Sequence, residues 1–185
     1  MSAEMKGEYE VFALLRTCLM EGLSEFGIST GVDVRRFAQA NFNHGDKLVL
    51  LNLVKTSRVG WQARSYGMAE FDKVDKFARK DSWIEEQTYQ VSCIKKMLKT
   101  DDETTLTAED MSTSLITWLN GRGLDWLRDH ELSCYPIDPN SIIVYNDDSD
   151  LYQRRPVFSV TVIVNKSFKV AHPDVEVVGV ETMPV

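Results

Sequence analysis

Hydrophobic positions first recur at helical spacing near the start of the chain. Between residues 5 and 27, apolar side chains follow one another three or four positions apart, with charged residues between them. The positions concerned are Val11, Leu14, Leu15, Cys18, Leu19 and Leu23. One such stripe is typical of an amphipathic helix, and a glycine often follows the last helical turn. We therefore predict a first helix that stops at Gly27.

Two segments that favour β structure follow a polar passage. Residues 47–66 are rich in Leu, Val and aromatic side chains, which predicts one long strand, or two strands with a kink at Gly60. Residues 83–98 alternate apolar and polar positions, the pattern of a half-buried strand. We predict that the two segments form a long antiparallel hairpin. The mixed charges of residues 67–82 predict a hairpin tip or a loop.

A second helical region has clear local boundaries. Thr107 and Asp110 have the spacing of a capping box at a helix N-terminus. The apolar stripe that follows consists of Met111, Leu115, Trp118 and Leu119. Gly121 stands where a left-handed glycine would end this helix. We predict a shorter helix over residues 123–132, packed against the helix that follows Thr107.

The last third of the chain is predicted to be mostly strand. Residues 142–144 suit a short strand and residues 146–150 a turn. In residues 155–168, apolar and polar side chains alternate, which predicts a strand with one buried face. Residues 175–181 (VEVVGVE) are expected to form a last strand or part of a C-terminal arm over residues 166–185.

The order of these elements predicts the fold class. A helix, a long hairpin, two helices and further strands indicate an α+β fold, in which an antiparallel or mixed β-sheet carries helices on one face. The length of 185 residues fits one domain over residues 1–185.

Composition narrows the classes of function. A formal net charge of −7 argues against a general nucleic-acid binder, which needs a basic face, although DNA can slide through an acidic pore. Cys18, Cys93 and Cys134 lack CxxC spacing, which suits a reducing compartment, and Cys93 is expected to be a small buried hydrophobe. We see neither a signal peptide nor an apolar run long enough for a bilayer, and expect a cytoplasmic product without a membrane partner.

The sequence offers little catalytic chemistry. The three histidines, none of them at metal-ligand spacing, are His44, His130 and His172. Glycine-rich nucleotide motifs and a GxSxG motif are absent from the sequence. A carboxylate cluster that can bind a hard cation consists of Asp147, Asp148 and Asp150, but a solvated turn explains it more simply. We predict no enzyme, no cofactor and no metal site, and rank a metal-dependent enzyme last.

The end of the long strand favours contact with another protein. Its large polar-tipped side chains are Arg58, Trp61, Gln62, Arg64 and Tyr66. An extended chain would put all of them except Trp61 on one face, and Trp61 on the other with Val59. Arg, Trp and Tyr are enriched at interface hot spots because they bury much area and still satisfy a polar tip. The alternative is a solvated sheet face with one core tryptophan.

A second pair of arginines stands before the last predicted strand. Arg154 and Arg155 are expected to meet carboxylates of a neighbouring subunit. The alternative is a surface salt bridge, which stabilises a protein little.

Several stretches together resemble one protein family. They are SRVGWQARSY, WIEEQTYQVSCIKKM, TLTAEDMSTSLITWLNGRGLDWLRDHEL and YNDDSDLYQRRPVFSVTVIVN. Their motifs and order are similar to those of bacteriophage neck proteins of the tail-terminator or gateway type, over roughly residues 46–165. The resemblance implies a structural protein, not an enzyme, that caps the tail tube and joins it to head-completion proteins. It also implies α+β subunits in a ring of six, or of twelve in related neck rings.

The partners follow from this resemblance. They are copies of the chain itself, tail tube and sheath proteins, head–tail connector and collar proteins, and genomic DNA that passes through the lumen without specific binding. The implied location is the virion neck, assembled in the host cytoplasm. A ring needs two different complementary patches on each subunit. The arginine-rich strand end can form such a pair with the acidic segments 101–110 and 146–150, which include the aspartates 147, 148 and 150. The alternative is a monomeric or dimeric phage adaptor that forms no ring.

Overall fold

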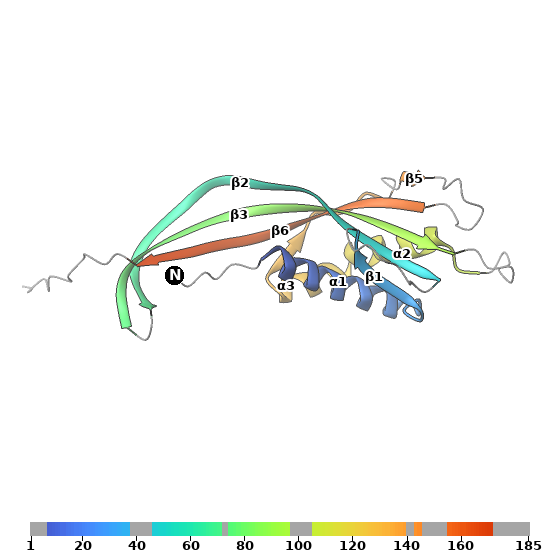
Figure 1. The fold of residues 1–185 in the computed structure, drawn as a ribbon, viewed down its shortest axis with the longest axis horizontal. Helices are drawn as coiled ribbons and strands as arrows, with labels where there is room; N and C mark the ends of the chain where they lie inside the picture. The colour runs from blue at the N-terminus through green and yellow to red at the C-terminus, as the bar shows by residue number, and fades with distance from the viewer. Residues whose placement is uncertain are drawn as a thin grey trace, which may run out of the picture.

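The computed structural model describes residues 7–37, 46–71, 74–96, 105–139, 143–145 and 155–171. Within these residues, helices lie on one face of a six-stranded sheet, and part of the sheet runs far beyond them (Figure 1). The helices are α1 (Glu8–Glu25), α2 (Ala108–Leu119) and α3 (Arg122–Asp129). The strands are β1 (Val32–Arg36), β2 (Lys47–Phe71), β3 (Val74–Lys95), β4 (Leu132–Cys134), β5 (Ile143–Tyr145) and β6 (Arg155–Ala171). This confirms the predicted α+β class.

The sheet is mixed and its order is β1-β2-β3-β6-β4, with β5 also paired to β6. β1 runs parallel to β2, and all other pairs are antiparallel. β2 and β3 form the predicted long hairpin, which is longer than expected. The prediction of a tip or loop over residues 67–82 is wrong for most of that segment, because β2 continues to Phe71 and β3 begins at Val74.

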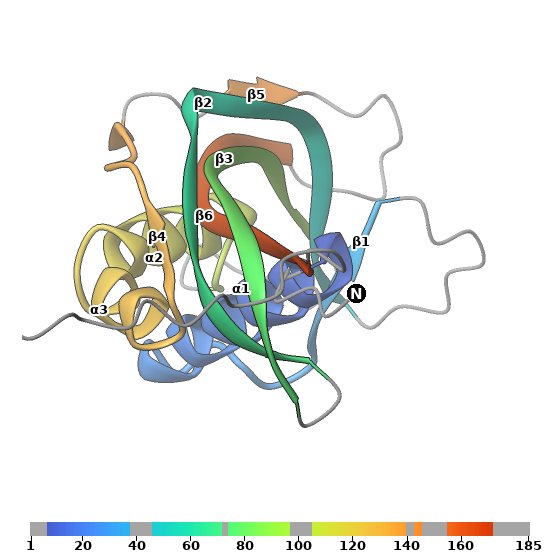
Figure 2. The same cartoon turned by 90° about the vertical axis from the view of Figure 1, so that its left-hand side faces the viewer.

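The hairpin contains the irregularity expected at Gly60. The ladder between β2 and β3 shifts register between Leu53 and Lys55, and again between Val59 and Ala63. Gly60 has a φ of +72°, which a residue without a Cβ adopts without strain. β2 therefore stays one strand but bows away from β3 in the second bulge, as two perpendicular views show (Figures 1 and 2).

The hydrophobic core lies between the helices and the adjacent half of the sheet. The predicted stripe of α1 contributes Leu15 and Leu19, and the alternation of β6 contributes Phe158 and Val162, all buried. α1 ends at Glu25, and Gly27 follows with a φ of +70°, as predicted.

The capping box of α2 is present. The Asp110 amide donates to Thr107 Oγ1 at 3.0 Å, and the Thr107 amide donates to Asp110 Oδ2 at 2.8 Å. The prediction for Gly121 is wrong: it has a φ of −125° and precedes α3. A left-handed residue is unnecessary there because α2 passes almost directly into α3.

Sequence patterns missed β1 and β4. β1 lies inside the segment that looked like a polar connection, and β4 begins where the second short helix was expected to end. α3 stops at Asp129, and Glu131 has a φ of 59°. β6 runs to Ala171, so the first six residues of the predicted C-terminal arm are strand. The other residues of the predicted C-terminal segment, 172–185, and the predicted turn at 146–150 lie outside the described residues.

Candidate interaction surface

Three strands project from the helical body. We call this part the arm: residues 54–71 of β2, 74–86 of β3 and 163–171 of β6 (Figure 1). β1 covers the outer edge of β2 only as far as Leu51. Among the described residues, no strand pairs with that edge beyond this point. Open edges present unpaired amide and carbonyl groups, with which a strand of another chain can pair.

The register puts three of the predicted interface residues on one face of the arm. Arg58 pairs with Glu85, Arg64 with Asp81, and Tyr66 with Arg79. These β3 positions alternate in phase with the buried Tyr89, so this is the face that carries the helices nearer the body. Gln62 lies inside the bulge, outside the ladder, and the alternation does not fix its direction.

The arginines of this face are bound to other arm residues. The Arg58 guanidinium lies 4.6 Å from the centroid of the Trp83 ring. Asp81, whose side chain is buried, lies 3.0 Å from Arg79 Nη2 and 3.6 Å from Arg64 Nε. A carboxylate between two guanidinium groups orders this part of the arm, because a buried charge is stable only when it is paired. Sequence reasoning missed Asp81 and Trp83. Both stand an even number of positions from Glu85, so the strand alternation puts them on the same face as Glu85.

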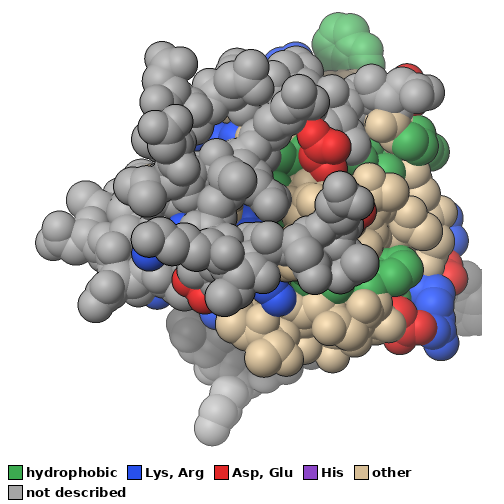
Figure 3. Space-filling model, turned by 90° about the vertical axis from the view of Figure 1, so that its right-hand side faces the viewer, with side chains coloured by type: hydrophobic (Ala, Val, Ile, Leu, Met, Phe, Trp, Pro, Cys, Tyr) green, Lys and Arg blue, Asp and Glu red, His purple; other side chains and the backbone are tan. Residues whose placement is uncertain are grey.

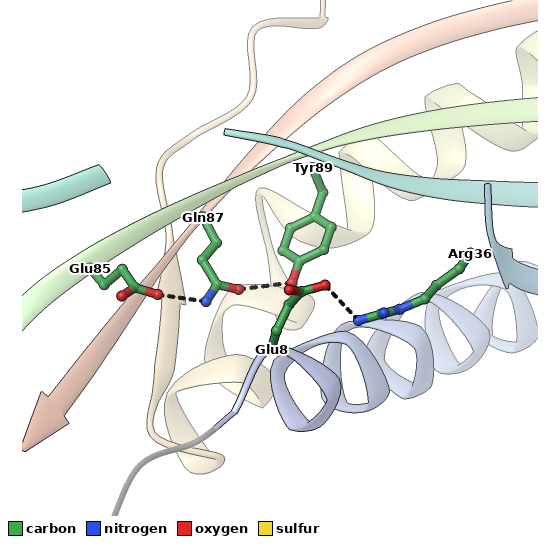
Figure 4. Close-up of polar contacts among 5 residues, drawn as sticks. All are labelled: Glu8, Arg36, Glu85, Gln87 and Tyr89. Atoms are coloured by element: carbon green, nitrogen blue, oxygen red, sulfur yellow. Dashed lines mark hydrogen bonds and ion pairs between the residues drawn. The ribbon is translucent and has the colours of Figure 1, made fainter. Parts of the chain in front are cut away.

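A polar chain joins the arm to the body (Figure 4). The Tyr89 hydroxyl donates to Gln87 Oε1 at 2.8 Å, and Gln87 Nε2 donates to Glu85 Oε1 at 2.8 Å. Lys166 Nζ lies 2.7 Å from the same Glu85 oxygen. Burial acts to raise the pKa of Glu85, but the bonds from Lys166 and Gln87 outweigh it and lower the pKa below its usual value.

An ion pair between α1 and β1 lies near Tyr89. Arg36 Nη2 lies 3.0 Å from Glu8 Oε1, and its guanidinium stacks over the rings of Tyr9 and Phe12 at 4.4 and 4.6 Å (Figure 4 shows the ion pair). Burial and the nearby Glu8 carboxylate raise the pKa of Tyr89 to about 12. These contacts of Arg36 hold β1 against α1, a structural role.

The bulge in β2 carries an aromatic side chain that is almost fully exposed. Trp61 is 98% exposed, so the alternative of a core tryptophan is wrong. Beside it lies a hollow of about 400 Å³ that Val59, Trp83 and Ile84 help to line. Val59 and Ile84 are themselves 38% and 43% exposed. Exposed apolar surface of this kind is typical of contact sites between proteins.

The remaining predicted interface residues lie elsewhere or outside the described residues. The Arg155 guanidinium lies 5.7 Å from the centroid of the Phe37 ring. Arg154 and the three aspartates of the 146–150 turn lie outside the described residues. At the end of the molecule opposite the arm, the described side chains mix hydrophobic, acidic and basic types (Figure 3).

The buried titratable groups are structural. Burial raises the pKa of Cys18 and Cys93 to about 12, which keeps both thiols protonated at neutral pH. His130 caps α3, with its Nδ1 2.8 Å from the Trp126 carbonyl oxygen and its ring stacked on that indole at 3.8 Å. Within the described ranges, no three His, Cys, Asp or Glu side chains are grouped to hold a metal ion. The helices of the described residues are all too short or too polar to cross a membrane.

The exposed edge, the aromatic bulge and the charged face of the arm are features that suit contact with another protein. In a comparison with known protein families, the family model described as E217 gateway protein gp29 matches residues 10–173. The chain therefore belongs to this family of bacteriophage gateway proteins, which are structural proteins of head–tail joining and components of the virion. The match confirms the resemblance to neck proteins of the gateway type. No curated protein matches the chain.

Proposed function

We propose that this protein assembles into a ring in the phage neck, where it caps the tail tube and joins it to the head-completion proteins around the DNA channel. The observation that carries the proposal is the projecting arm with its open β2 edge and fully exposed Trp61. An arm of this kind adds little to the hydrophobic core of its own subunit. Its shape and side chains suit contact with another protein.

The charges of the subunit support head-to-tail contact between copies. The β2 segment 54–67 carries three cations and no carboxylate, whereas α1 and α2 together carry six carboxylates and one cation. A ring forms when one patch of each subunit binds a different patch of the next. We infer that the basic β2 segment of one copy meets an acidic surface of its neighbour. Glu109 and Asp110, in one of the acidic segments predicted for this role, lie in the first turn of α2.

The other partners follow from the place of a gateway protein in the neck. The ring has six copies, or twelve as the alternative, and contacts tail tube and sheath proteins on one side and connector and collar proteins on the other. DNA passes through the lumen, and the net charge of −7 suits passage without adhesion. Assembly takes place in the host cytoplasm. The function is structural, without turnover of a substrate.

The first test is the mass of the purified protein by light scattering over a concentration series, with negative-stain images of the largest species. Purified phage tails are then offered as an assembly template. Closed rings with a central hole wide enough for duplex DNA support the proposal. A chain that stays monomeric or dimeric both alone and on tails contradicts it and favours the adaptor alternative.

A matched pair of variants tests the contact surface. Arg64→Gln removes a cation of the β2 segment without setting a second carboxylate beside Asp81. Arg128→Gln removes a cation of α3 that is equally exposed, since the two side chains are 59% and 61% exposed. We expect Arg64→Gln to weaken ring formation and Arg128→Gln to leave it unchanged. Equal effects of the two substitutions would count against the β2 segment as the contact surface.

A further inference from the structure

The outer edge of β2 opens at the point where β1 ends. The last backbone bond across this edge runs from the Phe37 amide to the Leu51 carbonyl oxygen at 2.9 Å. β2 continues from there to Phe71, and no described strand pairs with the rest of this edge. The root of the arm therefore presents a row of backbone groups to which another strand can bond.

The ladder with β3 identifies the residues whose backbone groups face outward. Along an antiparallel ladder, residues alternate between bonding to the partner strand and pointing away from it. The Leu51 carbonyl points outward, to Phe37, and Leu51 pairs with Val91 of β3. Three further β2 residues pair with β3 residues an even number of positions from Val91: Leu53, Thr56 and Arg58. Their amide and carbonyl groups therefore face the same outer edge as those of Leu51.

An apolar hollow lies where this edge opens. Its volume is about 310 Å³, and most of its lining is apolar or aromatic: Phe12, Phe37, Leu51, Leu53 and Tyr89. The charged residues of the lining, Glu8 and Arg36, already pair with each other. Phe37 is 51% exposed. An apolar side chain on a strand beside Leu53 would enter this hollow and remove the exposed apolar surface from water.

The residues that follow the hollow along the edge are basic. Lys55 and Arg58 are exposed, and β2 contains no carboxylate from residue 47 to residue 69. Glu85, the carboxylate opposite Arg58 in the ladder, is bonded to Lys166 instead. Opposite charges on neighbouring strands stabilise their pairing, whereas like charges oppose it. The edge therefore favours a segment that places carboxylates beside Lys55 and Arg58.

The open strand edges of a second copy do not supply such a segment. Among the described residues, these edges belong to β1, β4, β5 and the arm segments of β2 and β6. β4 and β5 have three residues each and no carboxylate, and both arm segments are basic over residues 54–67 and 165–171. The carboxylate of Asp33 in β1 is bonded to Arg35. The segment that fits the edge therefore comes from a different protein.

We propose that an extended segment of a different protein adds a strand to the sheet along residues 53–58 of β2. An apolar side chain of this segment fills the hollow beside Leu53, and carboxylates lie beside Lys55 and Arg58. Backbone hydrogen bonds to the edge give affinity, and the side chains give selectivity. The ring contact proposed above is centred on Trp61 and Arg64, nearer to the tip of the arm. The strand contact therefore does not depend on the ring and leaves Trp61 exposed.

Designed peptides test the proposal on the full-length chain. The probes are the peptide TTLETTETT and its reverse, TTETTELTT, because a strand can add in either direction. In each, leucine is meant for the hollow and the two glutamates for the two cations. The charge controls carry lysine in place of both glutamates. The backbone controls carry N-methyl groups on one or the other set of alternate amides, because only one set of a bound strand faces β2.

Fluorescence anisotropy of labelled peptides measures the binding. We expect at least one direction of the acidic peptide to bind, and its lysine counterpart to bind about tenfold more weakly. N-methylation of one alternate set should abolish binding, and methylation of the other should have little effect. Arg58→Gln in the protein should weaken binding about threefold, whereas Arg128→Gln, an exposed arginine of α3, should not change it.

Hydrogen exchange of the β2 amides gives a second, independent readout. The amides of Leu53, Thr56 and Arg58 should exchange rapidly in the free chain and slowly in the presence of the acidic peptide. Slow exchange of these amides in the free chain at every protein concentration would overturn the proposal, because the edge would already be occupied. Slow exchange that appears only as the protein concentration rises would also overturn it, because the added strand would then belong to a second copy.

The peptide titration can overturn the proposal in its own way. Failure of both acidic peptides to bind, equal binding of the lysine peptides, or equal binding of the two methylated sets would each do so. Ring mass plays no part in these results, so a failed strand contact and a failed ring are distinguishable.

Discussion

Substitution of Trp61 can distinguish a contribution to folding from a contribution to assembly. Its side chain is 98% exposed, so replacing it with alanine removes almost no buried surface from the isolated subunit. We expect Trp61→Ala to change the free energy of unfolding by no more than about 0.5 kcal/mol, the usual range for exposed positions. Trp118, which is 8% exposed and donates from Nε1 to Cys18 Sγ at 3.4 Å, is the matched control. Trp118→Ala should cost about 3 to 5 kcal/mol, as expected for a buried aromatic side chain.

In assembly we expect the larger effect from the Trp61 substitution, the reverse of the order expected for unfolding. If Trp61 lies in the contact between subunits, its loss should cost about 2 kcal/mol or more per contact, the level that defines a hot spot. That free energy corresponds to about a 30-fold weaker association at each contact. Urea unfolding at low concentration measures the first quantity, and light scattering over a concentration series measures the second.

Two results would refute the argument for Trp61. A loss of more than about 2 kcal/mol in the unfolding of the isolated Trp61→Ala chain would show that the indole is part of the core. Unchanged ring formation by a stably folded Trp61→Ala chain would show that the exposed indole does not contribute to assembly. Either outcome would remove the main support for the arm as a contact surface.

Three further predictions concern the body and the root of the arm. Thr107→Ala should cost about 1 kcal/mol of unfolding free energy through loss of the α2 cap, whereas the exposed Thr113→Ala, measured by the same urea titration, should cost less. Gly123→Ala should cost about 1 to 3 kcal/mol of unfolding free energy, because a Cβ there would lie 2.6 Å from the Trp118 indole and 2.9 Å from the Trp118 carbonyl oxygen. The control is Gly67→Ala, where a Cβ would have no atom within 4 Å. Equal losses of unfolding free energy in the two variants would contradict this packing. Because the pKa of Glu85 is lowered in the folded state, its contribution to stability should be present at neutral pH and lost as the pH falls through that lowered value. Glu85→Gln should therefore reduce the fall in unfolding free energy at acid pH. An unchanged fall would contradict the lowered pKa of Glu85.

Local sequence patterns were sufficient where an element interacts mainly with its own neighbours in the chain. The helical stripe of α1, the capping box of Thr107 and Asp110, and the alternation along β6 were all predicted correctly. Each depends on short-range geometry: 3.6 residues per helical turn, two residues per strand repeat, or a bond between residues three positions apart. The α+β class follows from the order of such elements.

Tertiary contacts decided what these patterns could not. Residues 67–82 looked like a loop because their charges hide any apolar alternation, but the arm needs no buried face and its strands are held by the ladder with β6. β1 exists because it pairs with β2 across a gap of ten residues in the chain. The exposure of Trp61 depends on a bulge that only the register with β3 reveals. Strand pairing joins residues that are distant in sequence, so a local pattern determines which residues can form a strand, and only the tertiary structure determines which face remains open to a partner.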